Sequence, residues 1–128
     1  MSFQKDIIAT NKAPEAVGTY SQGVEYNGVF YYSGQIGINP ATSTLAEGFE
    51  AQMGQILNNI DGLLESCSLT REHIIKTSIF VTDLKNFEMV NKAYTEFFSA
   101  PYPARSCIEV PALPKGALVE IEVIAAKG

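Results

Sequence analysis

Residues 103–126 read Pro-Ala-Arg-Ser-Cys-Ile-Glu-Val-Pro-Ala-Leu-Pro-Lys-Gly-Ala-Leu-Val-Glu-Ile-Glu-Val-Ile-Ala-Ala. Two runs rich in β-branched residues, 105–110 and 118–125, flank a turn that contains proline and glycine and that no regular strand crosses. The pattern predicts two strands that pair as a hairpin.

Side chains alternate between the two faces of a strand, so Arg105 and Cys107 share one face of the first run. On the second run, Glu120 points away from the face expected to join the core, which carries Val119, Ile121 and Val123. A hairpin centred near residues 113–114 would place Cys107 opposite Glu120 or its neighbour, with Arg105 one step further along. We therefore expect an arginine, a thiol and a carboxylate to lie close together.

This stretch resembles the signature of the Rid family of enamine/imine deaminases, also called the YjgF family. The resemblance covers about residues 7–126, because further segments follow in the order that this family uses. It implies a chorismate-mutase-like fold that assembles as a homotrimer, with sheets facing inward and three sites in the clefts between subunits. The further segments are Gly18-Thr-Tyr-Ser-Gln22, Ser33-Gly-Gln-Ile-Gly37, Glu50-Ala-Gln52, Lys76-Thr-Ser-Ile-Phe-Val-Thr-Asp83 and Val90-Asn-Lys-Ala-Tyr-Thr-Glu-Phe-Phe98.

The composition favours one compact domain over residues 1–128, because 46% of the residues are hydrophobic and 18% are charged. A net charge of −5 without a cluster of Lys and Arg argues against a nucleic-acid partner. Charged and polar residues interrupt the first dozen positions, so we expect neither a secretory signal nor a membrane span. Cys67 and Cys107 form no Cys-x-x-Cys motif and His73 is the single histidine, so we expect no disulfide, no zinc site and a cytoplasmic location.

Local patterns predict an α+β fold. Residues 24–33 are typical of a hairpin, because Asn27 and Gly28 suit a tight primed turn. Apolar residues at spacings of three and four predict helices over 49–67 and 87–97. A β-branched run predicts a strand over 74–82.

A short edge strand is expected around Ile7 and Ile8. The order of elements favours a mixed sheet with both helices on one face, which leaves the other face for partner subunits to bury. The solvent side of the first helix is expected to carry Asn59, Asp61 and Glu65.

Arg105 is the leading candidate for substrate binding. A guanidinium binds a carboxylate through two parallel hydrogen bonds, which fix both position and orientation. From the residues alone, an internal ion pair with Glu109, Glu120 or Glu122 accounts for this arginine equally well. The resemblance favours a substrate carboxylate.

Glu120 is the second candidate, as the group that holds water and moves protons. A carboxylate among apolar strand residues is partly desolvated, which raises its pKa. The alternative is an exposed strand glutamate, the natural interpretation of Glu122, and the resemblance places Glu120 beside the substrate.

The resemblance also implies pocket roles for a tyrosine on a loop, two polar residues, a glycine and a cysteine. The tyrosine could instead pack over its loop, the polar residues could brace local backbone, and the glycine could form a bulge rather than admit a ligand or a neighbouring chain. The thiol has no histidine partner in its motif, so lining the pocket is favoured over a nucleophilic role. These residues are Tyr20, Ser33, Asn91, Gly34 and Cys107.

The reaction implied by the resemblance is hydrolytic deamination of 2-aminoacrylate, 2-iminobutanoate and 2-iminopropanoate to 2-oxo acids and ammonia, without a metal or organic cofactor. A module that binds 2-oxo acids without turnover, for regulation, uses the same pocket and stays open. An RNA-acting or translation-inhibiting role, attached to parts of this family, is disfavoured by the acidic charge. A chaperone-like role would require an exposed apolar patch.

Overall fold

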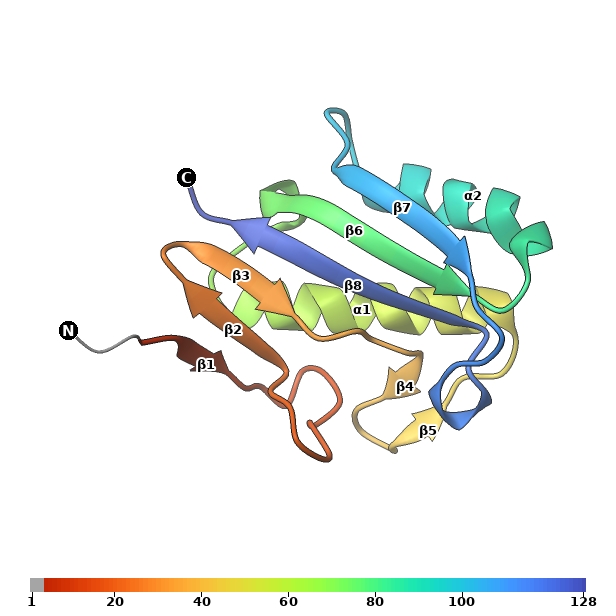
Figure 1. The fold of residues 1–128 in the computed structure, drawn as a ribbon, viewed down its shortest axis with the longest axis horizontal. Coiled ribbons are helices and arrows are strands. Elements are labelled where there is room, and N and C mark those ends of the chain that lie inside the picture. Colours follow the sequence, from red (N-terminus) through yellow and green to blue (C-terminus); the bar gives the residue numbers. More distant parts are fainter. Residues whose placement is uncertain (1–3) are drawn as a thin grey trace.

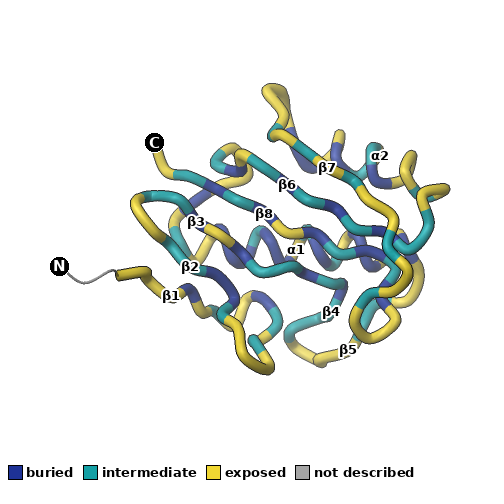
Figure 2. The backbone as a smooth tube through the Cα atoms, viewed as in Figure 1, coloured by how far each residue is buried: buried dark blue, intermediate teal, exposed yellow. Residues whose placement is uncertain are grey.

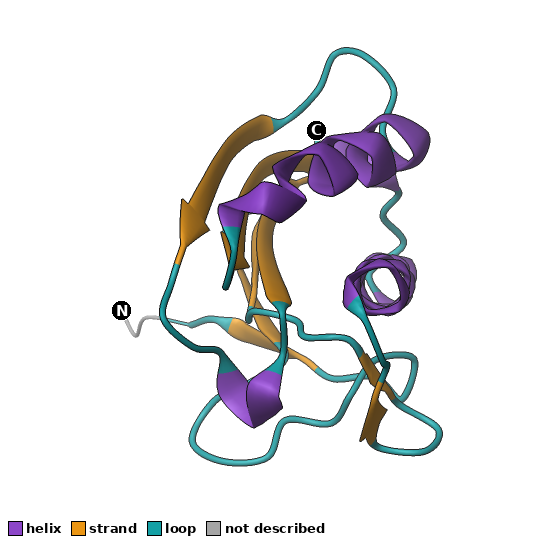
Figure 3. Cartoon of the chain, turned by 90° about the vertical axis from the view of Figure 1, so that its right-hand side faces the viewer, coloured by secondary structure: helices purple, strands orange, loops and turns teal. Residues whose placement is uncertain are grey.

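The computed structural model describes residues 4–128 and shows a sheet with two helices on one face (Figures 1 and 3). The helices are α1 (Phe49–Ser66) and α2 (Phe87–Phe97), close to the predicted ranges. Among residues 4–128, no helix has both the length and the apolar character needed to cross a membrane. The main sheet contains β1 (Asp6–Ile8), β2 (Gly23–Tyr26), β3 (Val29–Tyr32), β6 (Ile74–Val81), β7 (Ala104–Glu109) and β8 (Val119–Ala126), and a small hairpin contains β4 (Ile38–Asn39) and β5 (Thr44–Leu45).

The strand order in the main sheet is β1-β2-β3-β8-β6-β7. Strands β6 and β7 are parallel, whereas the other neighbouring pairs are antiparallel. The prediction of a mixed sheet with both helices on one face is therefore confirmed. The edge strand β1 and the hairpin of β2 and β3 are also confirmed, and Asn27 and Gly28 take φ angles of 52° and 80° in the turn.

The predicted hairpin of residues 105–110 and 118–125 is wrong. Strand β6 lies between β7 and β8 and pairs with both of them. Helix α2 connects β6 to β7 as a crossover, which parallel strands require, and β8 then returns antiparallel to the other side of β6. Two strands joined by a Pro/Gly turn can pair directly or lie on either side of a third strand. The sequence pattern of this stretch is the same in both cases, so it did not distinguish them.

The core lies between the helices and the covered face of the sheet (Figure 2). Val119, Ile121 and Val123 are at most 3% exposed, which confirms the predicted core face of the last strand. Helix α1 presents Ile56, Ile60 and Leu63 to the same core, and these side chains are also at most 2% exposed. The covered side is thus closed by the chain itself.

The prediction that Asn59 faces solvent is wrong, because this side chain is fully buried. Its Nδ2 donates a hydrogen bond of 2.9 Å to the carbonyl of Ile38 in β4, and its Oδ1 accepts one from Gln55. The small hairpin of β4 and β5, which the sequence analysis did not anticipate, covers that side of α1. Asn59 therefore joins the hairpin to the helix.

Candidate functional site

Arg105 lies on β7, one of the two edge strands of the main sheet, with its side chain toward α2. Its Nη1 donates a hydrogen bond of 2.7 Å to Oδ1 of Asn91. The guanidinium carbon lies 5.3 Å from the ring centre of Phe87 and 5.0 Å from that of Tyr94, both within cation–π range. These three helix residues are four and three positions apart, so one face of α2 forms the cradle for Arg105.

The alternative of an internal ion pair for Arg105 is wrong for the part of the chain that the structure describes. No salt bridge joins Arg105 to a carboxylate among residues 4–128. Glu109 instead accepts a hydrogen bond from the backbone N–H of Leu84, and Glu120 lies on the opposite face of the sheet. The half-buried guanidinium of Arg105 therefore carries a positive charge that no acidic side chain among residues 4–128 pairs with.

Cys107 follows two positions later on the same face of β7 and packs against the core. Burial raises the pKa of its thiol, and the nearby Arg105 only partly offsets that rise. The thiol is therefore protonated near neutral pH, which supports a lining role over a nucleophilic one.

Glu120 is partly buried on the open face of β8, level with Phe80 of β6. Its carboxylate lies against the backbone of Gly34, where a Cβ would come within 2.1 Å of Oε2. Burial, and then the like charge of Glu122, raise the pKa of this carboxyl group. A side chain at position 34 would therefore displace the Glu120 carboxylate.

Ser33 connects this glycine to the loop that carries Tyr20. Its Oγ donates a hydrogen bond of 2.6 Å to the carbonyl of Ser21, and its backbone N–H donates one of 2.9 Å to the carbonyl of Gln22. Tyr20 is 53% exposed and its ring lies near Gly18 of the same loop, so packing over the loop and lining a pocket both stay open for this residue. Ser33, Gly34, Glu120 and the Tyr20 loop form one group at the open side of the sheet.

The predicted site residues thus fall into two groups. Arg105, Asn91 and Cys107 lie on the covered side of the sheet, whereas Glu120 lies on the open side. In the sheet, Arg105 of β7 is level with Val123 of β8, two strands away. Glu120 lies three residues from Val123 along β8, so the backbones of Arg105 and Glu120 are roughly 14 Å apart. The expectation that arginine, thiol and carboxylate meet within one chain is wrong.

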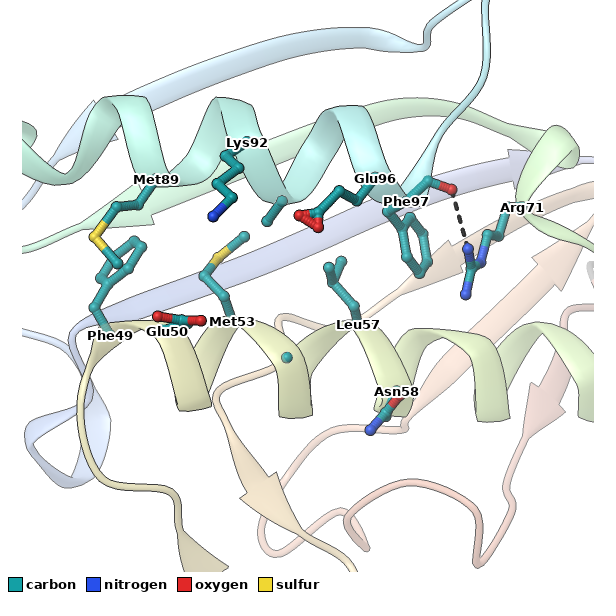
Figure 4. Close-up of a pocket in the computed structure, with 12 residues that line it drawn as sticks. Phe49, Glu50, Met53, Leu57, Asn58, Arg71, Met89, Lys92, Glu96 and Phe97 are labelled. Atoms are coloured by element: carbon teal, nitrogen blue, oxygen red, sulfur yellow. Dashed lines mark hydrogen bonds between the residues drawn. The ribbon is translucent and has the colours of Figure 1, made fainter.

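A groove of about 450 Å³ runs between α1 and α2 and contains none of the predicted site residues (Figure 4). It is hollow because Gly54 and Ala93 are small, and its floor includes Met53 and Leu57. Arg71 at its end is already held by Asp61 and the carbonyl of Phe97. Within the described part of the chain, no three His, Cys, Asp or Glu side chains are grouped so that they could hold a metal ion.

The family described as Endoribonuclease L-PSP, which includes the Rid (YjgF) proteins, matches residues 10–127. The chain belongs to this family. A "RutC family protein" of Aquifex aeolicus is 49% identical over 122 residues, covering 94% of this chain and 98% of that protein. A protein of Salmonella typhimurium named "2-iminobutanoate/2-iminopropanoate deaminase" is 45% identical over 123 residues, covering 94% of this chain and 96% of that protein.

Solved structures agree with this assignment. The crystal structure of YyfA from Yersinia pestis, a Rid family protein described as being of unknown function, superimposes with a TM-score of 0.94 and 50% identity. It covers 97% of this chain and 100% of that one. The Rid fold predicted from the sequence is therefore confirmed.

The positions of Phe87 and Tyr94 beside Arg105 were not predicted from the sequence. Their helical spacing with other apolar residues predicted a core-facing stripe, and Tyr94 is indeed only 7% exposed. Only the position of β7 beside α2 shows that the same stripe also holds Arg105. The sequence did carry a signal for this arrangement. Asn91 lies four residues after Phe87 and three before Tyr94, so the three side chains share one face of the helix.

Proposed function

We propose that this Rid-family protein hydrolyses short enamines and imines of amino acids, such as 2-aminoacrylate, 2-iminopropanoate and 2-iminobutanoate, to 2-oxo acids and ammonia. The observation that carries this proposal is the guanidinium of Arg105, which is oriented by Asn91 and has no carboxylate partner within residues 4–128. It suits the carboxylate that all these substrates share. The name of the Salmonella relative supports the same substrate class.

The two groups of site residues support a site between subunits. Because Arg105 and Glu120 lie on opposite faces of one sheet, a single site takes Arg105 from one copy and Glu120 from another. The open face carries exposed apolar side chains, among them Ile7, Tyr31 and Ile108, that a second copy would bury. A homotrimer with three such sites is the assembly that we propose.

The reaction follows from these positions. Arg105 binds the substrate carboxylate, and Asn91 and Cys107 of the same subunit line that end of the site. From the neighbouring subunit, the polar backbone at Ser33 and Gly34 and the carboxylate of Glu120 face the imine carbon, and Tyr20 covers the small side chain. The cytoplasm is the proposed compartment.

Glu120 holds a water molecule against the imine carbon and accepts a proton as the C–O bond forms. Glu120 returns this proton to the nitrogen, which gives the carbinolamine. The carbinolamine hydroxyl then gives its proton to Glu120, the nitrogen gains a proton in exchange, and ammonia leaves as the C–N bond breaks and the C=O bond forms. When 2-aminoacrylate is the substrate, its terminal carbon first gains a proton and its nitrogen loses one, which gives 2-iminopropanoate. Orientation and charge placement are sufficient, because such imines are already reactive toward water.

The test generates 2-aminoacrylate with a serine dehydratase, traps it with semicarbazide and measures the loss of semicarbazone as the protein is added. We expect the wild type to lower the yield and Arg105→Ala to have no effect. Unchanged yields with several short imines would overturn the deaminase. In that case, binding of 2-oxobutyrate by the wild type, weakened by Arg105→Ala, would identify a non-catalytic module for 2-oxo acids.

The family description also names an endoribonuclease, so the same preparations are incubated with single-stranded RNA. The net charge of −5 disfavours RNA binding, and we expect no cleavage. Salt-sensitive cleavage that survives Arg105→Ala would assign a separate nuclease activity.

A further inference from the structure

Tyr94 and Thr77 form a buried polar contact directly beside Arg105. Thr77 is 1% exposed and Tyr94 is 7% exposed, and their hydroxyl groups share a short hydrogen bond. Thr77 of β6 is also the direct partner of Arg105 in the parallel register of β6 and β7. The hydroxyl contact therefore joins the helix to the strand at the level of the arginine.

The ring of Tyr94 lies 5.0 Å from the guanidinium carbon of Arg105, and the ring of Phe87 lies 5.3 Å from it. Burial raises the pKa of Tyr94, so its phenol is neutral and offers the cation its ring rather than a negative charge. The two rings thus restrict the position of the guanidinium without neutralising it.

Asn91 accepts the hydrogen bond of Nη1. Among residues 4–128, no acceptor is bound to Nη2 or Nε of Arg105. Those two donors form one edge of the planar group, the edge that binds a carboxylate through two parallel hydrogen bonds. The direction in which this edge points depends on the rings and on Asn91, and so on the hydroxyl contact that fixes Tyr94.

We infer that Tyr94, held by Thr77, is a positioning residue that fixes the guanidinium of Arg105 with its free edge directed at the substrate carboxylate. This inference rests on the proposed function. A phenylalanine and a valine would fill nearly the same volume without two buried hydroxyl groups. Packing therefore does not require the two hydroxyl groups, and their contact serves to orient the ring of Tyr94.

The test measures binding of 2-oxobutyrate by calorimetry, together with binding of 2-oxobutanamide, which lacks the carboxylate. We compare wild type, Tyr94→Phe, Thr77→Val and Thr77→Ser. Tyr94→Phe and Thr77→Val are expected to weaken 2-oxobutyrate binding about five-fold or more, which corresponds to the loss of one hydrogen bond. They leave binding of the amide unchanged, and Thr77→Ser, which keeps the hydroxyl group, restores binding of the acid.

Tyr32→Phe is the matched control. Tyr32 is a buried tyrosine, 5% exposed, whose hydroxyl group donates a hydrogen bond of 3.4 Å to Sγ of Cys67 on the core side, and it makes no contact with Arg105. Thermal unfolding of both variants separates loss of stability from loss of orientation. In the deaminase assay, Tyr94→Phe is expected to raise KM more than it lowers kcat.

The outcomes separate the inference from the function on which it rests. If wild type neither binds 2-oxobutyrate nor consumes the imine, the proposed function fails. If wild type does both and Tyr94→Phe behaves like Tyr32→Phe, the function stands and the positioning role is overturned. Equal losses for the acid and the amide would overturn it as well, because they would indicate a general structural defect.

Discussion

The two faces of the sheet differ in what the chain packs against them. On the covered face, Arg105 has a hydrogen-bond partner and two aromatic neighbours, all from α2. On the open face, Glu120 lies against the bare backbone of Gly34 among exposed apolar side chains. The two charged candidate residues thus lie on opposite faces of the sheet, the cation beside α2 and the carboxylate on a face that exposes apolar side chains, and the proposed function combines them from two copies of the chain.

The largest effect is expected from a charge placed on the open face of the sheet. Tyr31, 46% exposed there, is changed to Asp, and we expect the proposed trimer to dissociate and the proposed deaminase activity to fall by about a thousand-fold, because a desolvated charge opposes association. Met89→Asp on α2, where the side chain is 39% exposed, is the control for an apolar residue outside that face. Light scattering and activity check both. An unchanged oligomer with Tyr31→Asp would refute the assignment of the interface.

Mixing two inactive variants tests whether each site combines two chains. Arg105→Ala and Glu120→Gln are each expected to lose activity by about a hundred-fold or more, from the missing anchor and the missing proton-transfer group. When the two are unfolded together and refolded, about one quarter of the sites regain both groups, so about a quarter of the wild-type activity returns. The lack of any recovery from correctly assembled mixtures would place both groups of a site in one chain.

Gly34→Ala tests whether the position of the Glu120 carboxylate matters for the proposed reaction. The added Cβ would lie 2.1 Å from Oε2 of Glu120, so the carboxylate must move while the fold remains. We expect kcat to fall about ten-fold, as a mispositioned proton-transfer group implies. Gly54→Ala, where a Cβ meets nothing within 4 Å, is the control and leaves kcat unchanged. Equal activity of the two variants would remove Gly34 from the site.

Glu122→Gln gives the smallest effect, seen in the pH profile. Burial and then the like charge of Glu122 raise the pKa of Glu120, so removing that charge lowers it. In the proposed mechanism the ionised carboxylate is the active form, so we expect activity to fall as the pH drops through this pKa and the acid limb of the kcat profile to move to lower pH in the variant. Glu88→Gln on α2 makes the same charge change elsewhere and leaves the limb in place. A shift to higher pH would contradict the role of Glu120 as the base.

Part of this architecture could be predicted because it depends on short-range patterns. The Asn27-Gly28 turn, the apolar stripes of α1 and α2 and the alternation along β8 each express a local preference that the structure keeps. The identity of Arg105 and Glu120 as candidates followed from their place in a family signature. Their roles remain predictions that the experiments above test.

Other parts depended on which segments are neighbours in space. The last two strands looked like a hairpin, because a Pro/Gly turn looks the same whether its strands pair or are separated by a third. Asn59 looked solvent-facing, because the hairpin of β4 and β5 that buries it is too short to leave a clear pattern. Both errors concern long-range pairing, which helical or strand periodicity does not encode.

The helices, most strands, the family and the charged residues of the candidate site could be predicted from the sequence, because each is encoded in residue types at close spacing. Only the tertiary structure decided that β6 separates β7 from β8, and so that Arg105 and Glu120 point to opposite faces. The physical reason is that the strand order results from how the whole chain buries its apolar surface. The crossover through α2 packs that helix against the sheet. Direct pairing of β7 with β8 would leave the position of α2 unspecified.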